Sequence, residues 1–91
     1  MPKFAVTITF DDLDARDEAR PEHRVYLKSL LDEGKLVESG PFADDSGALL
    51  IYEADSEAEL GSWLSEDPYA KADGVIAETV VKEWIRVFPA P

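Results

Sequence analysis

Hydrophobic and polar residues alternate with a period of two near the start of the chain, and this pattern predicts a β-strand over Lys3 to Phe10. The segment from Val75 to Phe88 is rich in Val, Ile, Thr and aromatic residues, which predicts a long last strand, either bent or extending beyond the sheet. Two short β-prone runs, 35–39 and 48–53, flank the turn-forming segment Asp44-Asp45-Ser46-Gly47. They predict a hairpin with a fairly long loop.

Two other stretches have the spacing of amphipathic helices. Pro21 suits the first turn of a helix, so we expect the first helix to start near Arg20 and to stop at Gly34. Ser56 and Glu59 have the spacing of a capping box and predict a second helix that ends before Pro68. The residues expected to face inward are His23, Tyr26, Leu27, Leu30 and Leu31 on the first helix, and Leu60, Trp63 and Leu64 on the second.

The predicted order of elements is β, α, β, β, α, β over one domain, residues 1–91. Right-handed crossovers then favour an α+β, ferredoxin-like βαββαβ fold, with an antiparallel four-stranded sheet and both helices on one face. The third and fourth strands carry apolar residues on both faces, yet helices cover only one face. We therefore expect a homodimer in which the other face meets a second sheet.

Charge and composition narrow the function classes. The chain has 20 acidic and 9 basic residues, a net charge of −11, which disfavours nucleic acid as a partner. It has no cysteine, no apolar run long enough to span a membrane and no signal peptide by our reading. We expect a soluble cytoplasmic protein without a membrane partner.

The one histidine, His23, is the first candidate for chemistry at neutral pH. Its expected place near the positive end of the first helix disfavours the protonated ring. Asp67 continues the inward stripe of the second helix, and antiparallel helices bring it toward His23. We expect the two side chains within hydrogen-bonding reach beside a pocket, with Asp67 orienting the imidazole. From pattern alone, the structural interpretation is the commoner one for both: a lone histidine on an apolar face is usually a hydrogen-bonded packing residue, and Asp67-Pro68 is an ordinary helix-ending dipeptide.

Further residues are weaker candidates. Ser39, beside Gly40, is either a hydroxyl donor at a strand end or part of a turn, and Tyr69 and Trp63 are either pocket walls or core residues. Arg20 either clamps an anionic substrate or is solvated near the helix start. We expect no metal site and no cofactor, because the chain shows no zinc, calcium, phosphate-loop or dinucleotide motif.

Several short motifs occur together in one order. They are Arg20-Pro21-Glu22-His23, Tyr26-Leu27, Gly34-Lys35-Leu36-Val37, Ser39-Gly40-Pro41-Phe42 and Asp67-Pro68-Tyr69. In the order and spacing of these motifs, the chain resembles the YCII-related family over almost its whole length. The resemblance implies a ferredoxin-like fold that dimerises in the manner of dimeric α/β barrels. It also implies a His and Asp active-site pair at His23 and Asp67, with Arg20, Ser39, Gly40 and Tyr69 at matching motif positions and able to bind substrate.

Few members of the family have a known reaction, and those resemble dehydrochlorinases or lactone-handling enzymes. The leading hypothesis is a small lyase, isomerase or hydrolase in which His23 moves a proton and Asp67 holds its tautomer. One alternative is a non-catalytic dimeric module that binds a small molecule or docks a partner. A third interpretation makes the pair purely structural.

Overall fold

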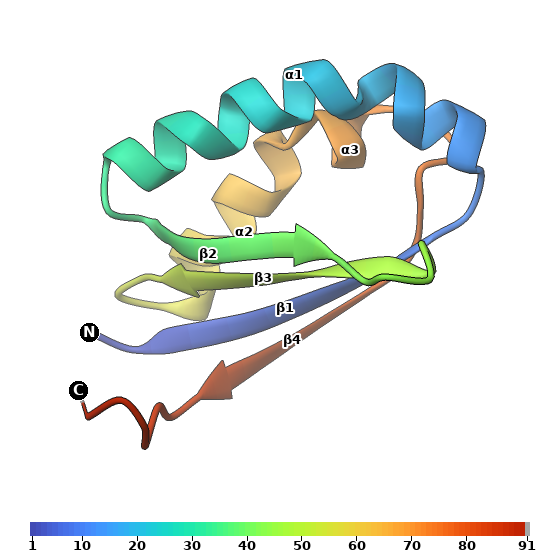
Figure 1. Cartoon of the computed structure of the whole chain (residues 1–91). Coiled ribbons are helices and arrows are strands. Elements are labelled where there is room, and N and C mark those ends of the chain that lie inside the picture. Colours follow the sequence, from blue (N-terminus) through green and yellow to red (C-terminus); the bar gives the residue numbers. More distant parts are fainter. Residues whose placement is uncertain (91) are drawn as a thin grey trace.

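The computed structural model describes residues 1–90 and confirms the predicted α+β ferredoxin-like fold. The strands are β1 (Lys3–Phe10), β2 (Leu36–Pro41), β3 (Gly47–Glu53) and β4 (Ile76–Trp84). The helices are α1 (Leu13–Asp32), α2 (Glu57–Glu66) and the short α3 (Pro68–Lys71). The strands form one antiparallel sheet in the order β2-β3-β1-β4, and all three helices lie on one face of it (Figure 1).

The core lies between that face of the sheet and the helices. Side chains alternate across a strand, so the large apolar residues of β1 point to one side, and their partners on β3 point the same way because Val6 pairs with Leu50. Leu60 of α2 is fully buried, while Trp63 and Leu64 pack half-buried against the core. The buried strand residues are Phe4, Val6 and Ile8 on β1 and Ala48, Leu50 and Tyr52 on β3.

The predicted start of the first helix was wrong. Helix α1 begins at Leu13, seven residues before Arg20, and Pro21 lies inside it. Asp12 caps the helix because its Oδ1 accepts hydrogen bonds from the backbone N–H groups of Asp14 and Ala15. Pro21 has no N–H to donate within the helix, but the cap and the packing of the first turns outweigh that loss.

Two consequences follow for the residues of α1. His23 lies in the middle of the helix, so the positive helix end does not act on it as the sequence suggested. Leu31, expected in the inward stripe, is 46% exposed, whereas Leu27 and Leu30 are buried as predicted.

Buried Arg16 explains why α1 begins early. Its guanidinium donates hydrogen bonds to the carboxylates of Asp17 and, at 2.9 Å, Asp45, and it lies 4.9 Å from the centre of the Phe10 ring. The bonds from Arg16 lower the pKa of the Asp17 carboxyl. Arg16 thereby joins the start of α1 to the β2–β3 turn and to the end of β1.

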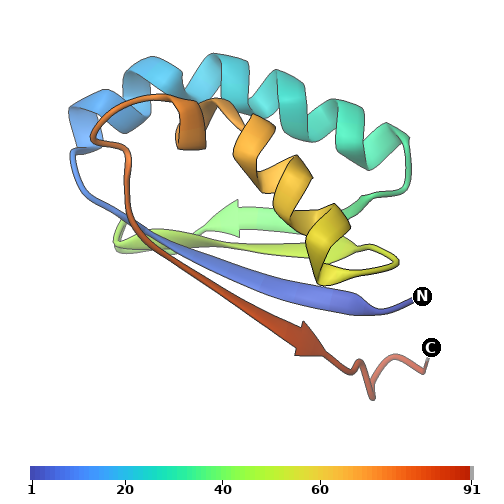
Figure 2. The same cartoon turned by 180° about the vertical axis from the view of Figure 1, so that it is seen from behind.

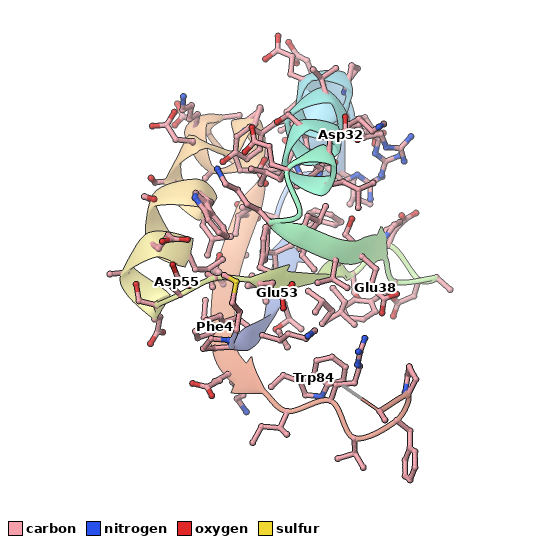
Figure 3. All side chains as sticks on the ribbon, turned by 90° about the vertical axis from the view of Figure 1, so that its left-hand side faces the viewer. Phe4, Asp32, Glu38, Glu53, Asp55 and Trp84 are labelled. Carbon is pink, nitrogen blue, oxygen red and sulfur yellow. The ribbon has the colours of Figure 1, made fainter. Side chains whose placement is uncertain are left out.

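The last strand is shorter than predicted. It ends at Trp84, while residues 85–88 of the predicted strand continue without strand pairing. The segment that leads from α3 into β4 passes the start of α1 (Figure 2), where the N–H groups of Asp11 and Asp12 bond to the carbonyls of Val75 and Gly74. Trp84 lies on the face of the sheet away from the helices (Figure 3).

None of the helices in residues 1–90 is both long and apolar enough to cross a membrane.

Candidate functional site

His23 and Asp67 meet where the middle of α1 passes the end of α2. The distance from His23 Nδ1 to Asp67 Oδ1 is 2.7 Å, within the hydrogen-bonding reach that the sequence predicts. Both residues are 7% exposed. The contact exists because Pro68 ends α2 and starts α3, which leaves Asp67 in extended backbone conformation between the two helices.

Asp67 also caps α3, and this second bond indicates the tautomer of His23. The same oxygen, Oδ1, accepts a hydrogen bond of 2.9 Å from the backbone N–H of Tyr69. An oxygen that accepts from a backbone N–H acts as an acceptor toward the imidazole as well, so Nδ1 carries the proton and donates it to Asp67. The lone pair of the histidine is then on Nε2, the nitrogen turned away from Asp67.

Tyr69 holds the imidazole ring in place by stacking. The two rings are nearly parallel, with 6° between their planes and 3.6 Å between their centres. Phe10 contacts Tyr69 edge-on, with ring centres 5.8 Å apart. Tyr69 is itself 3% exposed. The imidazole is therefore held by a hydrogen bond in its plane and by an aromatic ring against its face.

A pocket of about 150 Å³ opens beside His23. It lies between α1 and the sheet, beside the C-terminal end of β2. Its wall includes Arg20, Ser39, Gly40 and Tyr69. Its other lining residues are Phe10, Arg24, Leu27, Pro41, Ala48 and Leu50. The structure thus gathers, around one cavity, His23 and the four residues that the family resemblance singled out for substrate binding.

Ser39 reaches this pocket only because β2 is irregular. Leu36 pairs with Tyr52 and Ser39 pairs with Leu50, so three steps on β2 span two on β3. Such a bulge turns Ser39 to the face that Leu36 occupies, whereas strict alternation would place it on the opposite face.

Asp67 does not line the pocket that contains His23. It lies behind the imidazole and borders a second, mostly apolar cavity of about 220 Å³ that also contains Tyr52 and Ser65. Burial raises the pKa of the Tyr52 phenol, and the negative charge of Asp67 acts in the same direction. Trp63, a weaker candidate wall residue, lines neither cavity.

Sequence reasoning gave no site role to six residues that line the pocket, among them Arg24 and Phe10. Arg24 follows Arg20 by one helical turn, so their spacing was a usable signal once the helix extended on both sides of Arg20. Phe10 was assigned to the first strand without a role. In residues 1–90, no group of three or more His, Asp or Glu side chains is arranged to hold a metal ion.

Comparison with known proteins identifies the family. The sequence profile of the YCII-related domain matches residues 3–85. The chain belongs to the YCII-related family. Protein YciI of Escherichia coli is 34% identical over 88 residues, covering 86% of this chain and 89% of that relative.

Two further relatives of this YCII-related chain have more informative names. The "Derivative of benzaldehyde biosynthesis cluster protein C" of Emericella nidulans is 32% identical over 83 residues, covering 79% of this chain and 85% of that protein. The 5-chloro-2-hydroxyhydroquinone dehydrochlorinase TftG of Burkholderia phenoliruptrix, solved with 2,5-dihydroxybenzoquinone, aligns with a TM-score of 0.77 at 28% identity. That alignment covers 97% of this chain and 99% of TftG.

An antibiotic biosynthesis monooxygenase shares the fold at 16% identity, with a TM-score of 0.66 and coverage of 96% of this chain and 99% of that structure. Similarity at that level establishes the architecture alone.

Proposed function

We propose that this YCII-related protein is a small enzyme that acts on a small organic molecule by acid–base chemistry. The observation that carries the proposal is the 2.7 Å bond between His23 Nδ1 and Asp67 Oδ1 beside a pocket that His23 lines and Asp67 does not. This arrangement leaves Nε2 as the nitrogen available to take a proton from a bound molecule and to return it. Asp67 stabilises the imidazolium that forms in between.

The reaction type that this pair serves best is an elimination or isomerisation. Both move a proton between atoms of the substrate, which the lone pair of Nε2 can do without a covalent intermediate. For a chlorinated hydroquinone, the base takes a ring O–H proton, a proton returns to the carbon that bears chlorine, and chloride leaves as the quinone forms. The dehydrochlorinase TftG, a relative of the same fold, eliminates chloride from 5-chloro-2-hydroxyhydroquinone as its name states. Hydrolysis is a weaker candidate, because it also requires a positioned water.

The experiment that tests this function uses the compounds associated with TftG. We expect the purified protein to bind 2,5-dihydroxybenzoquinone and to release chloride from 5-chloro-2-hydroxyhydroquinone. Ser39→Phe fills the pocket from the exposed edge strand β2. Quinone binding and chloride release should both be lost in this variant, while its far-UV circular dichroism is unchanged. Ser62→Phe, at an exposed position of α2 away from the pocket, is the matched control and should keep both.

The outcomes separate the alternatives. Binding without chloride release would favour a non-catalytic small-molecule module. The proposed site would be contradicted if the wild-type protein neither bound the quinone nor released chloride, or if Ser39→Phe still did both.

We also propose that the protein works as a homodimer through the sheet face opposite the helices. Leu49, Val80 and Trp84 on that face are 38%, 36% and 40% exposed. The segment that follows Trp84 adds three more exposed apolar residues, Ile85, Val87 and Phe88. A second copy of the same sheet is a self-complementary cover for such a face. The cytoplasmic location expected from the sequence stays a prediction.

Light scattering at micromolar concentration should report twice the chain mass. Val80→Lys places a charge on the proposed interface and should give a monomer. Val25→Lys is the matched control, because Val25 is 73% exposed on α1, and it should remain dimeric. A monomeric wild-type protein, or a dimer that Val80→Lys leaves intact, would contradict this interface.

A further inference from the structure

The pocket beside His23 has a charge opposite to that of the whole chain. The net charge is −11, yet the residues that line this pocket in the described part of the chain include two arginines, Arg20 and Arg24, and no carboxylate. Asp67, the nearest acid to His23, lies behind the imidazole. A ligand in the pocket therefore meets guanidinium groups and no negative side chain.

This charge distribution follows from how α1 presents its two flanks. Arg20 and Arg24 are one helical turn apart and border the pocket beside His23. Glu18 and Glu22, also one turn apart, border a different hollow on the other flank together with Glu66 and Asp73. Two arginines of α1 thus border the pocket, and two of its glutamates border the hollow on the other flank.

The two arginines are largely uncommitted to protein partners. Arg20 lies 4.0 Å from Asp17, whose carboxylate already accepts two shorter hydrogen bonds from Arg16. Arg24 makes no ion pair or side-chain hydrogen bond with any residue in 1–90. Guanidinium groups in this situation are well suited to bind organic anions. Their planar N–H donors match the two oxygens of a carboxylate at once, and they also donate to the single oxygen of an ionised enol or phenol.

The remainder of the pocket fits a single flat ring. Its volume is about 150 Å³, and a cavity of about that volume accommodates benzene. The stacked rings of His23 and Tyr69, the Phe10 ring and the side chains of Leu27 and Leu50 supply an apolar wall. The hydroxyl of Ser39 adds a polar group at the mouth.

We propose that the natural ligand of this site is a monocyclic, planar organic anion whose charged group is bound by Arg20 and Arg24. This inference rests on the proposed function, because it specifies the substrate class of the same pocket. The arginines also favour proton removal by His23, because negative charge that develops on the ligand as a proton leaves is stabilised by the neighbouring guanidinium groups.

The test compares benzoate with benzamide, which has the same ring and shape but no charge. Binding is followed by NMR through the His23 ring and the amides of Ser39 and Gly40. We expect benzoate to bind at least about tenfold more tightly than benzamide. Arg20→Gln/Arg24→Gln should bring the two affinities to within about twofold of each other. Lys71→Gln/Lys82→Gln is the control with the same change in net charge, and it should keep the preference, because neither lysine lines the pocket.

Repeating the comparison in His23→Gln shows whether the imidazole rather than the arginines selects the anion; the preference should persist there. Equal binding of benzoate and benzamide, no binding of benzoate up to its solubility limit, or an unchanged preference in the double arginine variant would each overturn the proposal. Its failure is distinguishable from failure of the proposed function. If chloride release depends on the pocket but benzoate and benzamide bind equally, only the inference about the ligand class is wrong. If benzoate binds selectively but no substrate is turned over, only the proposed enzymatic function is wrong.

Discussion

Replacement of Gly47 by alanine is expected to lower the free energy of unfolding by more than about 3 kcal/mol, a large part of the stability of a domain of this size. Gly47 begins β3 and pairs with Thr9 of β1. A Cβ atom there would lie 2.0 Å from the carbonyl oxygen of Ile8 and 3.3 Å from the Cα of Thr9. Both obstacles are backbone atoms, so no side-chain rotation relieves the clash, and the two central strands must separate. Urea denaturation followed by tryptophan fluorescence measures the loss.

Two other glycines serve as controls for that substitution. Gly40 also lies in a strand, but nothing lies within 4 Å of a Cβ at that position, so Gly40→Ala should change stability by less than about 1 kcal/mol. Gly61 is inside α2 with the same open surroundings, and Gly61→Ala should stabilise the protein by roughly 0.5–1 kcal/mol. A Gly47→Ala protein as stable as the wild type would contradict the strand register described here.

Replacement of His23 by glutamine is expected to reduce the rate of chloride release by roughly 10²–10⁴-fold, the usual contribution of a general base. Glutamine preserves a polar side chain of similar reach, but its amide does not take up a proton at neutral pH. The fold should persist, because the helix and the neighbouring apolar contacts of Leu27 and Leu30 are unchanged. Initial rates of chloride release and thermal melts, recorded on the same preparation, measure the loss of activity and the persistence of the fold.

Asp67 should show a combined effect on rate and stability. Asp67→Ala removes the acceptor of two buried donors, the Nδ1–H of His23 and the backbone N–H of Tyr69, and should destabilise by about 3 kcal/mol. Asp67→Asn retains an oxygen for the backbone N–H of Tyr69 and adds an amide NH2 group that can donate to Nδ1 of the other His23 tautomer, so stability should fall by less than about 1 kcal/mol. Its rate should still fall about 100-fold or more, because an amide neither stabilises an imidazolium nor enforces the Nδ1–H tautomer.

Since the chain has one histidine, its tautomer is directly observable by ¹⁵N NMR. The wild-type protein should show the proton on Nδ1, and Asp67→Asn should populate the Nε2–H form. If instead the rate is unaffected in both His23→Gln and Asp67→Asn while stability falls in both, the pair is structural. That result would end the acid–base proposal.

The pattern of the sequence predicted the order of strands and helices well, and the reasons are local. The alternation in Lys3–Phe10 matched β1 residue for residue, and Ser56 caps α2 with its side-chain oxygen bound to the N–H of Glu59, as the capping spacing predicted. Each of these signals lies within a few residues of the element it specifies, so no tertiary contact is needed to interpret it.

The sequence was misleading where a distant contact outweighed a local preference. Pro21 indicated a helix start, but capping by Asp12 and the bonds of Arg16 to Asp45 stabilise a helix that begins earlier. Residues 85–88 have strand composition, yet pairing with β1 ends at Trp84, because β1 begins opposite it at Lys3. A strand at the edge of a sheet needs its neighbour's hydrogen bonds as well as its own propensity.

For the candidate site, the sequence by itself determined which side chains were available and that His23 and Asp67 should face inward on packed helices. Only the tertiary structure decided that one oxygen of Asp67 serves both Tyr69 and the imidazole, that a bulge turns Ser39 toward His23, and that Arg24 joins Arg20 at the pocket. The physical reason is that helix and strand periodicities specify the direction of a side chain from neighbouring residues. Distances between elements, and hence the pocket and its charge, depend on how the whole core packs.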